Sequence, residues 1–306
     1  MGTAVGVIGL GNMGGPIAQN LLEAGFDVVG LDIDPDRMAP FMANGGKAAA
    51  SPAEVTEGAG IVILSLPNVG ALEQVLHGPG GLAAEGRSGV VCIESSTFPL
   101  SAKVAAQTAL AEKDIALLDC TVSGTGSQAR DRNIVFYTSG PPELLERCRP
   151  IFEAVSKAAP RVGDFGAGSI MKFVSNLLVA VHTVAAAEAL TLAAKAGLDV
   201  GTAFEHISVG AGNSRMLEVR GPLMVAGEYD IGSATLDTLT KDSTIILDFA
   251  GDQDCPVPML SIAATFLRAA AAQGLNEQDP AVVKEVLFAL AGLPANTQHD
   301  GGGSNG

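Results

Sequence analysis

Three glycines near the start of the chain carry the clearest chemical signal, in the segment Gly-Leu-Gly-Asn-Met-Gly at 9–14. An apolar run precedes them and a helical pattern follows. In such a strand, turn and helix, Gly9 permits the tight turn, Gly11 lets the backbone approach a pyrophosphate, and Gly14 lets the helix pack closely. The segment therefore predicts a dinucleotide-binding turn whose cofactor contacts are Gly9, Leu10, Gly11, Asn12, Met13 and Gly14.

An acidic residue follows these glycines at the distance that a dinucleotide-binding unit requires. The helical pattern ends at Gly25, and the next apolar run, residues 27–31, ends on Asp32. A carboxylate there accepts hydrogen bonds from a ribose 2′-hydroxyl and repels a 2′-phosphate, so NAD is favoured over NADP. Asp34 adds negative charge nearby, whereas Arg37 is a cation that can pair with a phosphate.

A second possible site centres on Lys172, the only Lys or Arg between Arg161 and Lys195. Its neighbours are apolar, and burying an ammonium group is costly unless it is paired, so Lys172 either extends to solvent or acts in a site. Asn176 is four residues further on, hence on the same face of a helix. In hydride chemistry the lysine can take or give a hydroxyl proton while Asn176 orients the lysine or the substrate oxygen.

Polar segments that follow predicted strands are expected at the carboxyl edge of the sheet, where doubly wound folds bind ligands. Residues 119–127 follow an apolar run at 115–118, and Ser123, Gly124 and Thr125 offer hydroxyl and backbone N–H groups that suit a carboxylate. A Gly/Ser-rich loop without a ligand is the alternative. The corresponding residues after two earlier strands, expected near the cofactor, are Leu66, Pro67, Ser96 and Thr97.

The composition is typical of a soluble enzyme. The 306 residues include 18 Lys plus Arg and 33 Asp plus Glu, and the net charge of −15 argues against nucleic acid or an anionic membrane as a partner. The four cysteines suggest neither a zinc site nor a disulfide framework, and no metal is expected. No signal peptide is recognisable, so we expect a cytoplasmic protein. The apolar stretch at 177–194 contains His182 and Glu188 and is expected to be a core helix rather than a membrane span.

The order of apolar runs and helical patterns predicts two domains. Up to about residue 163, short β-branched runs alternate with helical segments, which indicates a doubly wound parallel sheet. Beyond this point the patterns are helical only, beginning with a long helix at 169–196 that contains neither Pro nor Gly. We expect an α/β chain with an NAD-binding Rossmann domain at 1–163, an all-helical substrate or oligomerisation domain at 164–295 and a disordered tail at 296–306.

The chain resembles the β-hydroxyacid dehydrogenase family, which includes 3-hydroxyisobutyrate dehydrogenase, over residues 4–290. Four ordered motifs carry the resemblance: the glycine segment at 9–14, Ser-Ser-Thr at 95–97, Val-Ser-Gly at 122–124 and Gly-x-Gly-x-x-x-Lys-x-x-x-Asn at 166–176. The resemblance implies NAD-dependent oxidation of a 3-hydroxy acid. It also implies roles for individual residues: Lys172 as the catalytic lysine, Asn176 as its helper, Ser123 and Gly124 with Thr125 as the carboxylate site, and Lys241 as a further active-site lysine near the cofactor or substrate.

Three positions depart from the family pattern and leave the substrate open. Thr125 replaces the usual Gly, Thr121 replaces the usual Pro, and Glu94 replaces the common Asp. All three line or adjoin the implied carboxylate pocket.

Two segments are most similar to threonate and related sugar-acid dehydrogenases, namely 180–189 and 211–215. This similarity implies a polyhydroxylated acid, with Asn213, Ser214 and Arg215 meeting its hydroxyl or carboxylate groups. A helix N-terminal cap explains the same three residues equally well. The histidines at 182 and 206 are expected in structural rather than catalytic positions.

Two other functions are compatible with this fold. One is a reductase acting on imines or other carbonyl compounds, and the other is a catalytically silent NAD-binding module. By resemblance both typically lack the lysine, so Lys172 disfavours both. The long apolar helix and the helical second half suit packing between subunits, so a homodimer or homotetramer is expected, with a small-molecule hydroxy acid as the substrate.

Overall fold

The computed structural model describes residues 4–230 and 234–294, so the tail expected at 296–306 lies outside the described residues. The chain divides into two compact units, Met1–Phe173 and Val174–Gly306. The division falls within a long helix, α9 (Ala167–Lys195). Each unit is described by itself below.

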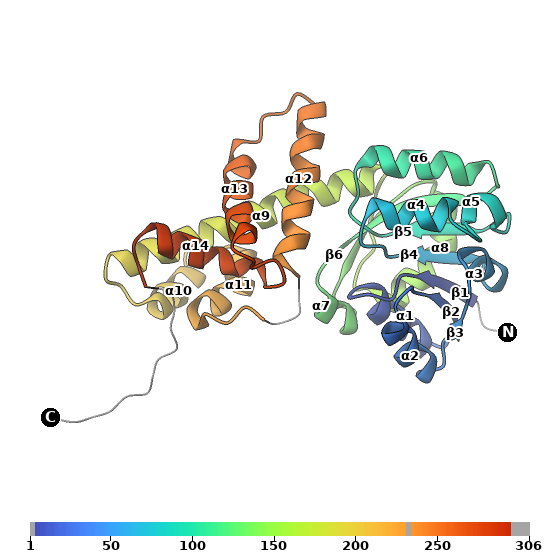
Figure 1. Cartoon of the computed structure of the whole chain (residues 1–306), viewed down its shortest axis with the longest axis horizontal. Coiled ribbons are helices and arrows are strands. Elements are labelled where there is room, and N and C mark those ends of the chain that lie inside the picture. The colour runs from blue at the N-terminus through green and yellow to red at the C-terminus, as the bar shows by residue number, and fades with distance from the viewer. Residues whose placement is uncertain (1–3, 231–233, 295–306) are drawn as a thin grey trace. The chain divides into compact units, whose positions relative to one another are not determined.

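The first unit is built on an eight-stranded sheet with the strand order β3-β2-β1-β4-β5-β6-β7-β8 (Figure 1). All neighbouring strands are parallel except β6 and β7, which are antiparallel. The expectation of a doubly wound sheet is confirmed, but β7 runs against its neighbour because the connection from β6 is too short for a parallel crossover. The strands are β1 (Ala4–Ile8), β2 (Asp27–Leu31), β3 (Lys47–Ala48), β4 (Ile61–Leu64), β5 (Val91–Glu94), β6 (Ala116–Ser123), β7 (Val135–Ser139) and β8 (Arg161–Gly163).

Helices cover both faces of this sheet, as parallel strands buried on both sides require. Figure 1 shows α4, α5 and α6 together on one face and α1 and α2 on the other. Two separate apolar cores result, one under α1 and α8 and one under α3 to α6. The helices are α1 (Gly14–Glu23), α2 (Pro35–Ala43), α3 (Pro52–Gly58), α4 (Val69–His77), α5 (Leu82–Glu85), α6 (Leu100–Ala111), α7 (Gly126–Arg130) and α8 (Pro142–Val155).

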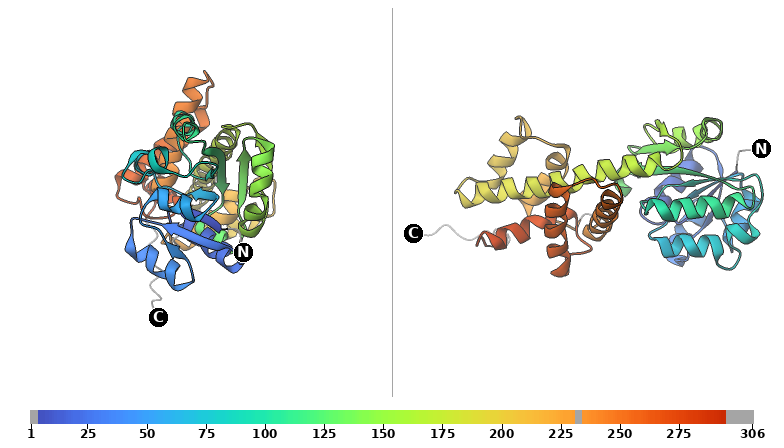
Figure 2. Two further views of the ribbon diagram at one scale, coloured as in Figure 1. Left: turned by 90° about the vertical axis from the view of Figure 1, so that its right-hand side faces the viewer. Right: turned by 90° about the horizontal axis from the view of Figure 1, so that it is seen from above.

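Helices are the only regular elements among the described residues of the second unit, as expected. Figure 2 shows α9 as its long helix, with shorter helices packed along it. Among the described residues, α9 alone is long and apolar enough to cross a membrane by length and composition. Its Ala180, Ala187 and Leu190 are buried, whereas Val174, Leu178 and Leu192 are exposed. The other elements are α10 (Val200–Ser208), α11 (Arg215–Ala226), α12 (Leu236–Asp252), α13 (Pro258–Ala272), the 3-10 helix η1 (Pro280–Val282) and α14 (Val283–Leu290).

The four cysteines are unpaired, and three of them are buried in the first unit. Burial raises the pKa of the Cys92 and Cys148 thiols to about 12, and burial also raises the pKa of Cys120. Because the thiolate is the reactive form, these three residues are chemically inert in the folded protein. Cys255 is exposed.

We therefore expect one thiol per chain to react rapidly with a disulfide reagent at pH 8, and four to react in denaturant. Replacement Cys255→Ser should abolish the rapid phase and leave the other three thiols unreactive. A second rapid equivalent in the native protein would contradict the buried placement of the cysteines.

Candidate functional site

In the glycine segment between β1 and α1, two positions lie so close to neighbouring backbone that they can carry no side chain. Gly9 has φ +92°, and a Cβ there would lie 2.1 Å from the carbonyl oxygen of Ser65. A Cβ on Gly14 would lie 1.9 Å from the carbonyl oxygen of Gly9, so the helix begins against the turn itself. No side chain caps the N-terminus of α1, where Met13 is the first residue outside the helix. This cradle fits a dinucleotide pyrophosphate at a helix N-terminus.

Asp32 ties the end of β2 to the glycine segment. Its Oδ2 accepts a hydrogen bond of 2.6 Å from the Leu10 amide, and its Oδ1 accepts one of 2.9 Å from the Asp34 amide. Each carboxylate oxygen has a second lone pair with which to bind ribose. The half-exposed Arg37 approaches Asp32 Oδ2 at 3.5 Å and Asp34 Oδ2 at 3.3 Å, so this cation lies next to the two acids. Arg37 also lies beside Gly11, because a Cβ on Gly11 would be 3.3 Å from the Arg37 guanidinium.

The loops after β4 and β5 are joined to each other. The Leu66 amide donates a 2.9 Å hydrogen bond to Ser96 Oγ, and the Ser96 amide donates one of 2.9 Å to Glu94 Oε1. Leu66 also lies beside Gly9, since its Cδ2 is 3.4 Å from the position of a Cβ there. The residues expected near the cofactor, which include Pro67 and Thr97 in the same two loops, thus continue the edge that the glycine segment begins.

The implied carboxylate loop is shorter than the apolar pattern predicts. The sequence places a strand end near 118, but β6 continues to Ser123, because Asp119 and Thr121 are buried polar residues within the strand. The loop therefore begins only at Gly124, which has φ +140°, a conformation that favours glycine. Thr125 then caps the N-terminus of α7.

The sequence predicts that the Thr125 hydroxyl and backbone N–H bind a carboxylate, but both groups make hydrogen bonds to Gln128. Its amide donates to Gln128 Oε1 at 3.0 Å, and its hydroxyl accepts from the Gln128 amide at 3.3 Å, which completes a capping box. The Thr125 N–H is thus engaged within the loop rather than offered to an anion. The loop also contacts the glycine segment at 9–14, because a Cβ on Gly126 would lie 2.5 Å from the carbonyl oxygen of Asn12.

The first turn of α9, which leads to Lys172, is fixed to β6 and β7. A Cβ on Gly168 would lie 2.4 Å from the carbonyl oxygen of Asp119, so the helix starts in contact with bare backbone. The Ser169 amide and hydroxyl donate to the two oxygens of Asp119 at 2.7 and 2.9 Å. The Gly168 amide donates to Ser139 Oγ at 3.0 Å. These bonds satisfy N–H groups of the first turn and place Lys172, which is partly buried, one turn from β6.

In the second unit, a buried carboxylate fixes the orientation of Asn176. The Asn176 amide nitrogen, Nδ2, donates a 2.7 Å hydrogen bond to Asp242 Oδ2, and both side chains are buried. A carboxylate only accepts, so the amide group must face Asp242 with its NH₂ and present its Oδ1 elsewhere. The Lys241 ammonium lies 3.3 Å from Asp242 Oδ1, an atom to which no hydrogen bond is made within the described part of the chain. The contact of this oxygen in the described chain is thus the ion pair with Lys241.

The segment around Asn213 lies in a different part of the second unit. Asn213 and Ser214 line a cavity of about 200 Å³ together with His182 on α9. Ser214 caps α11 by accepting from the Leu217 amide at 3.1 Å, which confirms the cap interpretation. Asn213 Nδ2 donates to Glu218 Oε1 at 2.8 Å, and no hydrogen bond reaches its buried Oδ1 in the described chain. Its proposed contact with substrate stays a prediction.

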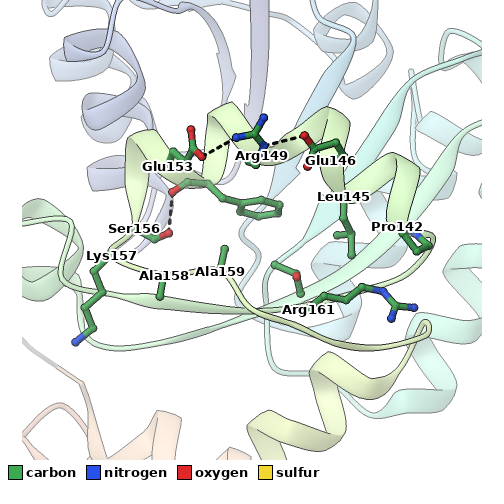
Figure 3. Close-up of a pocket in the computed structure, with 12 residues that line it drawn as sticks. Pro142, Leu145, Glu146, Arg149, Glu153, Ser156, Lys157, Ala158, Ala159 and Arg161 are labelled. Atoms are coloured by element: carbon green, nitrogen blue, oxygen red, sulfur yellow. Dashed lines mark hydrogen bonds and ion pairs between the residues drawn. The ribbon is translucent and has the colours of Figure 1, made fainter.

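A larger cavity, of about 410 Å³, lies at the opposite end of the sheet from the cofactor strands (Figure 3). It is bordered by β7, α8 and β8, and it shares no lining residue with the segments above. Its cations are already paired, as Arg149 is with Glu146 and Glu153. The described residues contain no cluster of three or more His, Cys, Asp or Glu side chains that could hold a metal.

The sequence analysis did not identify Lys103, Asp119 or Asp242 as residues that support these segments. It noted Glu94 but did not predict that this acid is buried. The signal for Lys103 was present, because it is a single cation in an alanine-rich helix, the same pattern that singled out Lys172. The pairing of the other three depends on contacts between residues far apart in the chain.

Both units match models of known protein families. Residues 4–167 match the model described as the NAD binding domain of 6-phosphogluconate dehydrogenase, and residues 166–287 match that described as the NAD-binding domain of NADP-dependent 3-hydroxyisobutyrate dehydrogenase. The two matches together span nearly the whole described chain.

Individual relatives are dehydrogenases of hydroxy acids. The chain is 37% identical over 300 residues to L-threonate dehydrogenase of Cupriavidus necator, covering 97% of this chain and 100% of that protein. It is 31% identical to 2-(hydroxymethyl)glutarate dehydrogenase of Eubacterium barkeri, over 94% of this chain and 96% of that one. The crystal structure of 3-hydroxyisobutyrate dehydrogenase from Salmonella typhimurium matches with a TM-score of 0.84 and 31% identity, over 93% and 99% of the two chains.

The geometry at Asp32 generates a prediction about cofactor choice. Replacement Asp32→Ala should weaken NADH binding about tenfold or more, because hydrogen bonds to a carboxylate contribute roughly 1.5–3 kcal/mol. NADPH should be weakened less, since Arg37 loses a carboxylate partner and becomes available to a 2′-phosphate. Fluorescence titration of both nucleotides measures the two dissociation constants. The control is Asp27→Ala, an exposed acid at the other end of β2, and equal weakening of NADH and NADPH would contradict a role in discrimination.

Proposed function

Because the chain belongs to the β-hydroxyacid dehydrogenase family and is an NAD-linked dehydrogenase of hydroxy acids, we propose that its substrate is a polyhydroxylated acid such as L-threonate. Support comes from the full-length similarity to L-threonate dehydrogenase. The expected simple 3-hydroxy acid, 3-hydroxyisobutyrate, is the alternative within the same reaction class.

In this proposal Ser123 and Gly124 bind the substrate carboxylate at the end of β6. Lys172 acts from the first turns of α9, where its Nζ accepts the proton of the reacting hydroxyl as hydride leaves the carbon. NAD, when bound, supplies the hydride acceptor. The observation that carries the proposal is the anchoring of the α9 turn to Asp119, because it fixes the lysine relative to the strand that ends in Ser123.

The bond to Asp242 determines what Asn176 contributes. Since Asp242 engages one N–H of its amide, Asn176 keeps its Oδ1 and a second N–H, and in this proposal Oδ1 accepts from the Lys172 ammonium or from the substrate hydroxyl. Lys241, whose ammonium is beside Asp242, is a second cation for a carboxylate or for the cofactor in this proposal.

An imine reductase of Pseudomonas sp. shares the fold, with a TM-score of 0.62 and 19% identity, which bears on architecture alone. Retention of Lys172 favours alcohol oxidation over this alternative and over a silent NAD-binding module. We further propose a cytoplasmic homodimer or homotetramer, for which the apolar α9 is a natural packing surface.

The test of substrate is NADH formation from NAD, and separately NADPH formation from NADP, with L-threonate, D-erythronate, D-glycerate, 3-hydroxyisobutyrate, 3-hydroxypropionate and L-serine. Turnover concentrated on the four-carbon sugar acids with NAD is the expected result. Product analysis identifies which hydroxyl is oxidised. Preference for 3-hydroxyisobutyrate would replace the proposed substrate, and absence of turnover with intact NADH binding would favour the alternative functions.

Lys172→Met should lower kcat by about 10²-fold or more, because the proton acceptor is lost, while the dissociation constant for NADH stays nearly unchanged. Stopped-flow absorbance and fluorescence titration measure these quantities. The matched control is Lys195→Met, an exposed lysine at the end of the same helix. Retained turnover in Lys172→Met would remove the lysine from the mechanism.

Asp242→Asn should lower kcat about tenfold, because a neutral amide at 242 can accept as well as donate and no longer dictates the orientation of Asn176. NADH binding should stay within twofold of the parent protein. Asp248→Asn, an exposed acid on the same helix, is the control. If Asp242→Asn keeps full kcat, the orientation of Asn176 has no part in the reaction.

A further inference from the structure

A fully buried lysine lies between two carboxylates in the first unit. Lys103 of α6 places its ammonium 2.5 Å from Glu94 Oε2 and 2.8 Å from Asp119 Oδ1, and all three side chains are excluded from solvent. Burial by itself would lower the pKa of Lys103, but the two carboxylates outweigh it and raise that pKa above its usual value. The lysine therefore remains charged, and it neutralises acids that face each other on β5 and β6.

One side of this cluster leads to the loop after β5. Lys103 Nζ donates a 2.7 Å hydrogen bond to the carbonyl oxygen of Ser96, while Glu94 Oε1 accepts from the Ser96 amide at 2.9 Å. Both backbone groups of Ser96 are thus held by the buried charges. Its hydroxyl accepts in turn from Leu66, so the loops after β4 and β5 share this support.

The other side leads to α9. Asp119, whose Oδ1 pairs with Lys103, uses both carboxylate oxygens to accept from the amide and the hydroxyl of Ser169. A side chain from the sheet therefore binds the first turn of the helix that carries Lys172. The cluster of Glu94, Lys103 and Asp119 connects two segments that are 73 residues apart in sequence, around Ser96 and around Ser169.

We propose that Lys103 is a positioning residue for the dehydrogenase reaction. Its ammonium fixes the loop at 95–97 and the α9 turn before Lys172 in one arrangement, through Glu94, Asp119 and the Ser96 carbonyl oxygen. The inference rests on the proposed function, in which Ser96 and Thr97 border the cofactor and Lys172 takes the proton. A purely structural buried ion pair can be replaced by neutral groups of similar shape at little cost, whereas a positioning group cannot.

The decisive variant is the neutral triple replacement Glu94→Gln, Lys103→Met and Asp119→Asn, which keeps side-chain size and leaves no unpaired buried charge. We expect it to fold, with a Tm within a few degrees of the parent, yet to lose kcat about 10- to 100-fold. Its dissociation constant for NADH should rise severalfold. Lys113→Met, an exposed lysine just after α6, is the matched control and should change neither quantity.

A folded triple variant with kcat and NADH affinity within twofold of the parent would overturn the proposal. A change in only one of the two quantities would also overturn it, because the lysine would then serve only one of the two segments. If wild-type enzyme oxidises no acid in the substrate panel, the proposed function fails, but NADH affinity still tests whether Lys103 supports the loop at 95–97.

The helix side is tested separately by Ser169→Ala, which removes one of the two hydrogen bonds to Asp119 without adding or removing charge. We expect kcat to fall severalfold with NADH affinity unchanged. Thr191→Ala removes a buried hydroxyl that bonds only within α9, to the Ala187 carbonyl oxygen, and is the control. If the triple variant does not fold, this comparison decides, and equal kcat for Ser169→Ala and the parent would overturn the proposal.

Discussion

The site depends on the contact between the start of α9 and the backbone of β6 and β7. Gly168 permits this contact, because a Cβ at that position would overlap the carbonyl oxygens of Asp119 and Tyr137, at 2.4 and 2.6 Å. The Thr121 hydroxyl donates to the Gly168 carbonyl oxygen at 2.7 Å, so the turn is bonded on several sides. The hydrogen bonds within a long helix fix its conformation but do not fix its position relative to the sheet. Here its first turn takes its position from the sheet, and the lysine takes its position from that turn.

Along the carboxyl edge of the sheet, each predicted binding segment touches the next. Asp32 binds the Leu10 amide, Leu66 binds Ser96, and the α7 loop meets the glycine segment where Gly126 faces Asn12. These contacts are local consequences of parallel strands that end at the same edge. They explain how separate short motifs combine into the single surface of the first unit at which we propose that the cofactor binds.

The sequence predicted the parts whose signal is local. The strand, glycine turn and helix at the N-terminus follow from short patterns and match the structure, and the long helix predicted at 169–196 is found at 167–195. The strand at β6 was predicted too short, because apolar runs do not reveal that Asp119 is a buried residue within a sheet. The engagement of Thr125 was readable, since Thr followed by Gln three residues later is a capping box. The partners of Lys103 were not readable, because they depend on how β5 and β6 align with α6.

The close approach of Gly126 to the Asn12 carbonyl oxygen restricts how this enzyme can change substrates. Any side chain at 126 would push the loop that begins at Gly124 away from the glycine segment, so this position accepts only glycine. Thr125 on one side is held by the capping box of α7, whereas Ser127 on the other side is exposed and can vary without moving that backbone. Divergence toward new acids is therefore expected to proceed by exchanging the side chain at 127 on an unchanged loop, and an enzyme that accepts several related acids is an accessible intermediate.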